Sequence, residues 1–227
     1  MATAAALTAP ARLGSWRPQE HRELLGLALS TVDDVTLTPR QAELADAALR
    51  IVAREGMRAV TFRSVAAESG WSLGAVQKAF ASKVDLHAAM FARLRASAGP
   101  PEATEPGRPT LHAWLVELVA GVLPLDERRR ALELQGAAFA ELAAYDSGLG
   151  QVIAADDRRL LGLLAGLVRR AQGEGEVDGR LDPDVVAWAV LAILQGAANQ
   201  LLYDPRPEEE IRALVGPALA GVLHLPS

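Results

Sequence analysis

Residues 61–86 read TFRSVAAESGWSLGAVQKAFASKVDL, and this stretch decides the fold. Thr61 is a favourable N-cap for a short helix that Ser69-Gly70 ends. Ser72 opens a second short helix, which runs from about Leu73 to Phe80. Two short helices joined by a tight turn that contains glycine form the helix-turn-helix arrangement, so we expect that motif here.

The helices on either side of this motif complete a small helical head. Thr38, Pro39 and Gln41 form the capping signature of a preceding helix. Gly56 is expected to end that helix in the left-handed conformation. A helix is also predicted after the motif, from Lys83 to Ala96. We expect Val65, Ala66, Val76 and Phe80 to bury the two motif helices against the first of these flanking helices.

The rest of the chain carries helical periodicity as well. The segment 98–109 is rich in proline and glycine and is interpreted as a linker. No run beyond it alternates apolar and polar residues as a half-buried strand does. Five longer helices are predicted at Thr110–Leu123, Asp126–Tyr145, Gly148–Gln172, Asp182–Tyr203 and Pro207–Leu223. The pattern predicts an all-α protein.

Charge divides the chain into three parts, which we interpret as its domains. Residues 1–37, an N-terminal extension expected to be partly disordered, carry three Lys/Arg and four Asp/Glu. Residues 38–97 carry nine and five, whereas residues 98–227 carry 11 and 19. A basic module joined to an acidic one is expected when only the first meets phosphate. Within the extension, residues 17–30 are predicted to form an amphipathic helix.

The helix-turn-helix stretch resembles the DNA-binding signature of the tetracycline-repressor (TetR) family. The family pattern joins a capping threonine, buried aliphatic positions, a glycine turn and a final lysine. Matching positions are Thr61, Val65, Ala66, Gly70, Ser72, Gly74, Val76, Phe80, Ser82, Lys83 and Leu86. The preceding helix and Gly56 stand at the family's spacing too. Beyond about residue 97, the resemblance is limited to length and helical character.

The resemblance implies a DNA-binding transcriptional regulator rather than an enzyme. Its head would be a three-helix helix-turn-helix domain over residues 38–97, and residues 98–227 would form a helical domain for ligand binding and dimerisation. The expected partners are a double-stranded, roughly palindromic DNA operator, a second copy of the chain and a small-molecule effector that releases a repressor from DNA. No cofactor is implied.

The residues expected at DNA lie on the second helix of the motif and at the starts of its neighbours. They are Thr61, Arg63, Ser72, Leu73, Gly74, Ala75, Gln77, Lys78 and Lys83. Arg63 has the donors to bind guanine O6 and N7, and Gln77 has the amide to bind adenine N6 and N7. Lys83 is expected on a backbone phosphate, which fixes position without reading sequence.

Three positions depart from the family pattern. Gln77 replaces a tyrosine that commonly contacts phosphate, Ala79 replaces histidine or tyrosine, and Trp71 replaces a small aliphatic residue. The exposed surface is therefore less aromatic than usual. The alternative interpretation is a degenerate family member, a dimer that binds a small molecule or a protein partner without specific DNA binding. In that case Arg63, Gln77, Lys78 and Lys83 would be dispensable.

The C-terminal part offers candidate pocket and interface residues. Bulky apolar walls and amides are the chemistry of a ligand pocket. The candidates are Trp114, Phe139, Trp188, Gln195 and Asn199. The last two predicted helices carry broad apolar stripes suited to a four-helix dimer interface. The interface candidates are Val186, Val190, Ile193, Ile211, Leu214, Val215, Ala218 and Val222, with ordinary core packing as the alternative.

Several other classes of function find no support in the sequence. Without cysteine there is no disulfide framework and no thiolate site, and the four histidines have no metal-ligand spacing. Asp156-Asp157 beside Arg158-Arg159 is interpreted as a solvated helix face rather than a catalytic pair. The N-terminus does not read as a secretory signal, and polar residues interrupt the longest apolar run. A cytoplasmic protein with no membrane partner is expected.

Overall fold

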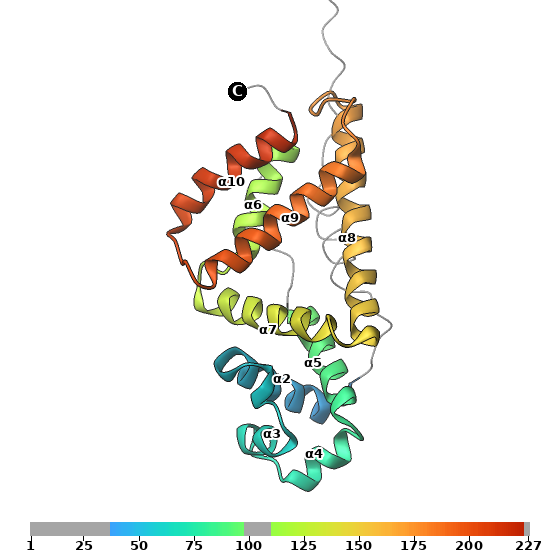
Figure 1. The fold of residues 1–227 in the computed structure, drawn as a ribbon, viewed down its shortest axis with the longest axis vertical. Helices are drawn as coiled ribbons and strands as arrows, with labels where there is room; N and C mark the ends of the chain where they lie inside the picture. Colours follow the sequence, from blue (N-terminus) through green and yellow to red (C-terminus); the bar gives the residue numbers. More distant parts are fainter. Residues whose placement is uncertain (1–36, 98–109, 225–227) are drawn as a thin grey trace, which may run out of the picture.

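The computed structural model describes residues 37–97 and 110–224, and these contain helices without any strand. The labels follow Figure 1. The elements are α2 (Pro39–Glu55), η1 (Met57–Ala59), α3 (Phe62–Ser69), α4 (Leu73–Ala79), α5 (Lys83–Ser97), α6 (Leu111–Val122), α7 (Glu127–Ala143), α8 (Ser147–Gly173), α9 (Pro183–Leu201) and α10 (Glu208–Val222). The all-α prediction is confirmed. The predicted helix over 17–30 and the linker over 98–109 lie outside the described residues.

Local capping chemistry sets the helix boundaries in the head. The Thr38 side chain accepts a hydrogen bond from the Gln41 backbone N–H, and the Gln41 side-chain oxygen accepts one from the Thr38 backbone N–H, which completes the predicted capping box. Gly70 joins α3 to α4 with φ +76° and ψ 2°, a left-handed conformation that favours glycine. Gly56 also has a positive φ of 82°, but its ψ of 170° is extended. The chain therefore turns into η1 instead of adopting the predicted left-handed cap.

The helices α3, α4 and α5 pack against the apolar face of α2. Leu44, Ile51 and Val52 of α2 are buried beside Val65, Val76 and Phe80, which lie on and after the two motif helices. Small alanines on α2 and α3 let the helix axes approach closely. The predicted packing positions are thus confirmed, and the motif is held rigidly on α2.

The body, which consists of α6, α8, α9 and α10, has a core of its own. Aliphatic side chains from all four helices fill it, and Leu115, Val168, Val190 and Leu219 are among those that are almost fully buried. By length and hydropathy alone, α9 is apolar enough to span a membrane. An apolar core helix meets the same criterion, and the buried residues of α9 pack against α8 in this core.

The seventh helix, α7, lies between the head and the body (Figure 1). Phe139 of α7 is completely buried in the core of the head. Its ring packs edge to face on the ring of Phe91 of α5, with 5.4 Å between the ring centroids. Gln135 is also buried, and its side-chain amide donates to the Leu49 carbonyl of α2 at 2.9 Å. The core of the head is therefore completed by a helix outside it.

An ion pair makes a second connection between the two parts. Arg95 of α5 contacts the Asp156 carboxylate of α8, and both side chains are largely shielded from water. Arg159 approaches the same carboxylate at 3.9 Å. Burial and the neighbouring charge of Arg159 lower the pKa of Arg95. The prediction that Asp156 belongs to a solvated face is wrong, because its side chain is only 17% exposed and contacts Arg95 of α5.

We predict that Phe139→Ala destabilises the whole protein by about 3–5 kcal/mol, because the truncated ring leaves a cavity in a closed core. The free energy of unfolding is measured by urea denaturation followed by circular dichroism. The matched control is Tyr145→Ala, which removes an aromatic ring that is 89% exposed and should change stability little. Equal losses for the two variants would contradict the shared core.

Candidate DNA-binding surface

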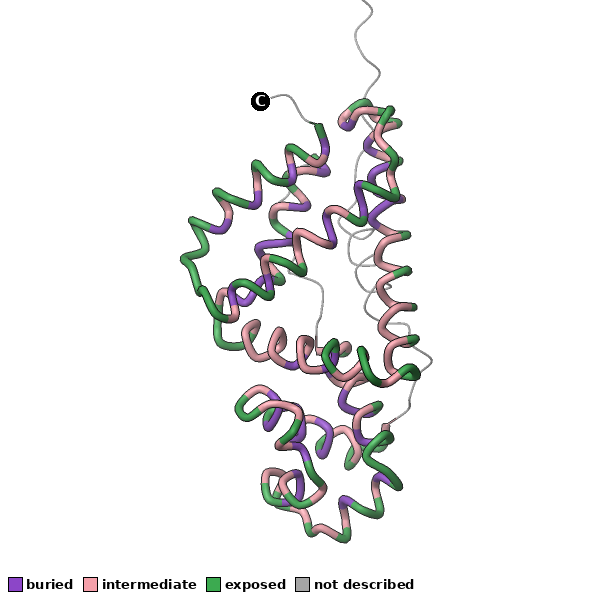
Figure 2. The backbone as a smooth tube through the Cα atoms, in the orientation of Figure 1, coloured by how far each residue is buried: buried purple, intermediate pink, exposed green. Residues whose placement is uncertain are grey.

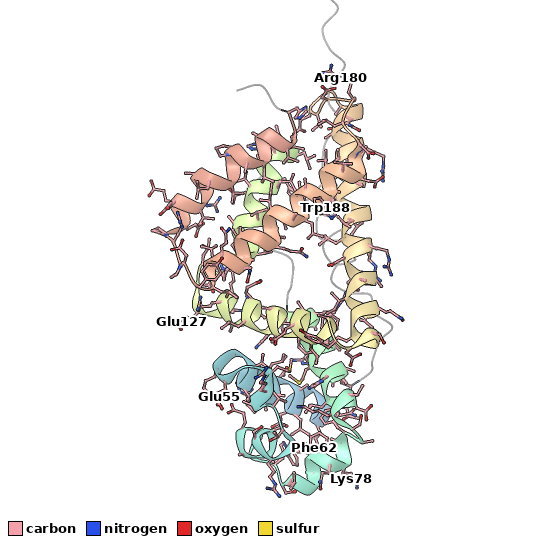
Figure 3. The ribbon with its side chains drawn as sticks, in the orientation of Figure 1. Glu55, Phe62, Lys78, Glu127, Arg180 and Trp188 are labelled. Carbon is pink, nitrogen blue, oxygen red and sulfur yellow. The ribbon has the colours of Figure 1, made fainter. Side chains whose placement is uncertain are left out.

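The fourth helix, α4, presents one free face at the end of the head remote from the body (Figures 1 and 3). The Ser72 side chain caps it by accepting from the Ala75 amide at 3.2 Å. Gly74, Gln77 and Lys78 are exposed, while Val76 faces the core. Three residues expected at DNA thus share a solvent-facing surface on the second helix of the motif.

The starts of the neighbouring helices add to this surface. Thr61 caps α3 and Arg63 lies in its first turn, and both are exposed. Lys83 begins α5 and is exposed as well. Ser82 and Asp85 cap that helix reciprocally at 2.9 and 3.1 Å, which fixes the position of Lys83. Leu73 and Ala75 are only half-buried, and Leu73 packs in part against the head core.

The cations of the head fall into two groups. Four arginines are neutralised by carboxylates of the chain: Arg50 and Arg54 by Glu68, Arg93 by Asp46 and Arg95 by Asp156. The others have no carboxylate partner among the described residues. They are Arg40, Arg58, Arg63, Lys78 and Lys83, and all of them are exposed. The net positive charge predicted for residues 38–97 is therefore carried on the outside of the head.

The three departures from the family pattern occupy different environments. Gln77 is exposed on the free face of α4. Ala79 is half-buried, and its carbonyl accepts a hydrogen bond from the Gln41 side chain of α2 at 3.0 Å. Trp71 is half-buried in the turn before α4, where the Arg40 guanidinium lies over its ring, 4.4 Å from the centroid.

The predicted pocket residues do not converge. Phe139 belongs to the core of the head, which corrects its assignment to a pocket. Trp188, Gln195 and Asn199 are exposed along α9, and Trp188 is 65% exposed, so these three do not line an interior wall of the chain. Trp114 alone packs against the body core, where it is partly buried. Helical periodicity placed these residues on helices but did not show which face of α9 is covered.

The predicted interface residues divide by burial. Val186, Val190, Ile211 and Val215 fill the body core, which corrects their assignment to a dimer interface. Ile193 and Val222 are partly buried against the same core. Figure 2 shows that exposed and buried positions alternate along α10. Leu214 and Ala218 are among the exposed ones, and Leu214 is 54% exposed. The most aliphatic sides of α9 and α10 therefore face the chain's own core. The exposed residues lie on the neighbouring sides of the same helices.

Sequence reasoning missed two half-buried carboxylates. Burial raises the pKa of Glu133 on α7 and of Asp157 on α8, and no cation or hydrogen-bond donor among residues 37–97 and 110–224 offsets it. One turn before Glu133, Arg130 donates to the Leu202 carbonyl at the end of α9 at 2.7 Å, so this side of α7 faces the body. Glu133 stands between two leucines in the sequence, whereas Asp157 is flanked by charged residues and carries no comparable signal. No cluster able to hold a metal ion occurs within 37–97 or 110–224.

A capped recognition helix with a free polar face, flanked by unpaired cations and mounted on a helical body, defines a helix-turn-helix DNA-binding regulator. Comparison with protein families shows which family of helix-turn-helix regulators the chain resembles. The family model for bacterial regulatory proteins of the tetR family matches residues 44–90, and the model for the C-terminal region of BetI-type transcriptional repressors matches residues 111–224. The chain belongs to the TetR family of transcriptional regulators.

Individual relatives agree with this assignment. The HTH-type nicotine-responsive transcriptional repressor HdnoR of Paenarthrobacter nicotinovorans is 26% identical over 184 residues, which cover 79% of this chain and 89% of the relative. A transcriptional regulator from Rhodococcus sp. Rha1 superposes with a TM-score of 0.70 at 25% identity, over 82% of this chain and 97% of that one. The multidrug-binding protein EbrR, solved with imidazole, has a TM-score of 0.56 at 27% identity, over 84% and 98%. These relatives are regulators or ligand-binding proteins, not enzymes.

We predict that Glu133→Gln raises the melting temperature at neutral pH. A carboxyl whose pKa is raised by folding binds its proton more tightly in the folded state, so stability falls as pH rises through the shifted pKa. Glutamine removes this penalty and keeps the volume. Differential scanning fluorimetry should show the gain at pH 7 and none well below the ordinary glutamate pKa of about 4.3. A gain of equal size at both pH values would show that ionisation is not its cause.

Proposed function

We propose that this TetR-family regulator is a cytoplasmic, dimeric repressor that binds a palindromic operator and is released by a small-molecule effector. The single observation that carries the DNA-binding part is the sorting of charge on the head. Carboxylates of the chain neutralise four of its arginines, while Arg63, Lys78 and Lys83 remain free beside the exposed face of α4. Free cations around a protruding helix match the phosphates that flank a major groove.

The roles within this surface follow from side-chain chemistry. Arg63 has paired donors for guanine, Gln77 has a donor and an acceptor for adenine, and both residues are exposed. Gly74 leaves the start of α4 without a side chain that would hold the backbone away from DNA. Lys83 serves as a phosphate contact. Repression rather than activation is supported by the relative HdnoR, which is a repressor.

A second copy of the chain is the proposed occupant of the exposed apolar strips on α9 and α10, which pack against each other in the body. Val185 and Trp188 are exposed on α9, and Leu214 and Ala218 are exposed on α10. Apolar side chains at these spacings form a helix face that water covers in the single chain. A twofold dimer through this surface presents two recognition helices to half-sites about 34 Å, or a multiple, apart.

The effector site is proposed among α6, α7 and α8. Trp114 supplies an aromatic wall, and the uncompensated carboxylates of Glu133 and Asp157 favour a ligand with a cationic or hydrogen-bond-donating group. Nicotine responsiveness in HdnoR supports a small organic effector. Testing which compounds release the protein from DNA would identify the chemical class of the effector. A cationic compound that releases Glu133→Gln as readily as wild type would remove this carboxylate from recognition.

We predict that Lys83→Ala weakens operator binding and reduces its salt dependence. Each lost phosphate contact lowers the slope of log K against log salt by about 0.9, so a dimer should lose about twice that. The measurement is a mobility shift at several salt concentrations, with DNA from upstream of the gene or from a random-oligonucleotide selection.

Arg180→Ala is the matched control, because Arg180 is exposed at the end of the body remote from the head (Figure 3). It removes the same charge without touching the proposed surface. Selective binding by wild type that Lys83→Ala leaves unchanged would exclude Lys83 from the interface. Absence of selective binding by wild type itself would favour a dimer without specific DNA binding.

We predict that Leu214→Arg converts the dimer to single chains, because an arginine in the centre of an apolar interface is desolvated without a partner. Analytical ultracentrifugation should give the mass of one chain for this variant and of two chains for wild type. Tyr145→Arg places the same charge on the connection between α7 and α8, outside the strips, and should stay dimeric. If the Leu214→Arg variant stays dimeric, the dimer interface does not lie on this surface.

A further inference from the structure

Arg40 stands apart from the other unpaired cations of the head, because an aromatic ring holds it in place. Its guanidinium carbon lies 4.4 Å from the centroid of the Trp71 ring. Arg40 belongs to the first turn of α2, and Trp71 belongs to the turn between α3 and α4. The stacked pair therefore spans from α2 to the residue just before the cap of the recognition helix.

The stack leaves the hydrogen-bonding capacity of Arg40 unused. Its side chain is exposed and makes no hydrogen bond or ion pair within the residues that the structure describes. A cation stacked through its flat face keeps the N–H groups at its edge free for a bidentate acceptor such as a phosphate. No acidic residue lies in the first turn of α2 to compete for the guanidinium.

Two contacts connect the first turn of α2, which carries Arg40, to the two ends of the recognition helix α4. The Trp71 stack ties Arg40 to the residue before Ser72, which caps α4. The adjacent Gln41 donates to the Ala79 carbonyl at the C-terminal end of α4 at 3.0 Å. The first turn of α2 is thus held against the length of α4, so DNA that accepts α4 in its groove brings backbone phosphates near this flank.

We propose that Arg40 is a further DNA-contacting residue that binds a backbone phosphate beside the recognition helix, with Trp71 as its positioning residue. The inference rests on the proposed DNA-binding function and extends the interface from the motif helices to α2. It also assigns a role to the tryptophan that departs from the family pattern. Aromatic surface absent at Gln77 is supplied from the turn, where it orients a cation instead of touching phosphate itself.

The test uses the full-length protein and DNA obtained by random-oligonucleotide selection with wild type. Arg40→Gln keeps a polar, exposed side chain and removes the charge. Binding to selected and to scrambled DNA should weaken by the same factor, and the salt slope should fall by about 0.9 for each head. Arg180→Gln, which removes a charge at the far end of the body, should leave both unchanged.

The positioning role is tested by non-additivity. Trp71→Leu should weaken binding in the wild-type background and have little further effect in the Arg40→Gln background, because it acts through that side chain. Trp71→Phe keeps an aromatic face and should retain most of the affinity. Additive effects of Arg40→Gln and Trp71→Leu would reduce Trp71 to a packing role and overturn the pairing.

The failure of this inference is distinguishable from failure of the proposed function. Selective wild-type binding with an unchanged salt slope in Arg40→Gln overturns the Arg40 contact and leaves the repressor assignment standing. A wild-type protein that selects no DNA sequence overturns both. Circular dichroism of each variant confirms that the helices are intact, which the exposure of Arg40 leads us to expect.

Discussion

The arrangement of the whole molecule depends on one apolar contact, the burial of Phe139 from α7 inside the core of the head. The head, residues 37–97, is small, and its core is completed by a ring from outside it. Because Phe139 packs on Phe91 of α5, and α5 follows the recognition helix directly, α7 and α4 are mechanically connected. The Arg95–Asp156 pair adds a second connection from α8 to the same helix. Both α7 and α8 therefore contact α5, the helix that follows the recognition helix.

The cations of the head differ in whether a carboxylate neutralises them. Arginines that link helices are paired, as Arg93 is with Asp46 in a two-pronged contact of 2.8 and 2.9 Å. Such bidentate pairs fix helix positions and leave no charge for a ligand. Within the described part of the chain, the head cations without a carboxylate partner lie on η1 and α4, at the starts of α3 and α5, and in the first turn of α2. The same residue types thus serve architecture and recognition, and the presence of a nearby carboxylate decides which.

Burial follows a similar division in the body. The most aliphatic sides of α9 and α10 face the chain's own core, and Trp188 and Leu214 are left in water on the neighbouring sides. Aliphatic side chains fill an interior densely, and an aromatic ring such as that of Trp188 is of the type that is enriched at protein interfaces. The apolar stripes therefore located the two helices, but they placed four of the eight interface candidates inside the core.

The sequence by itself determined the helices, because capping residues, glycines and periodicity act over a few positions; Thr38, Ser72 and Asp182 all cap where the pattern predicts. It also determined the motif and the exposed side of α4, since buried Val76 and Phe80 leave Gln77 and Lys78 to solvent. Only the tertiary structure decided that Phe139 belongs to the head, that Asp156 is covered and that Arg40 stacks on Trp71. Each of these contacts joins residues from different helices. A periodic pattern records which side of a helix is apolar, but it does not record which helix will cover that side.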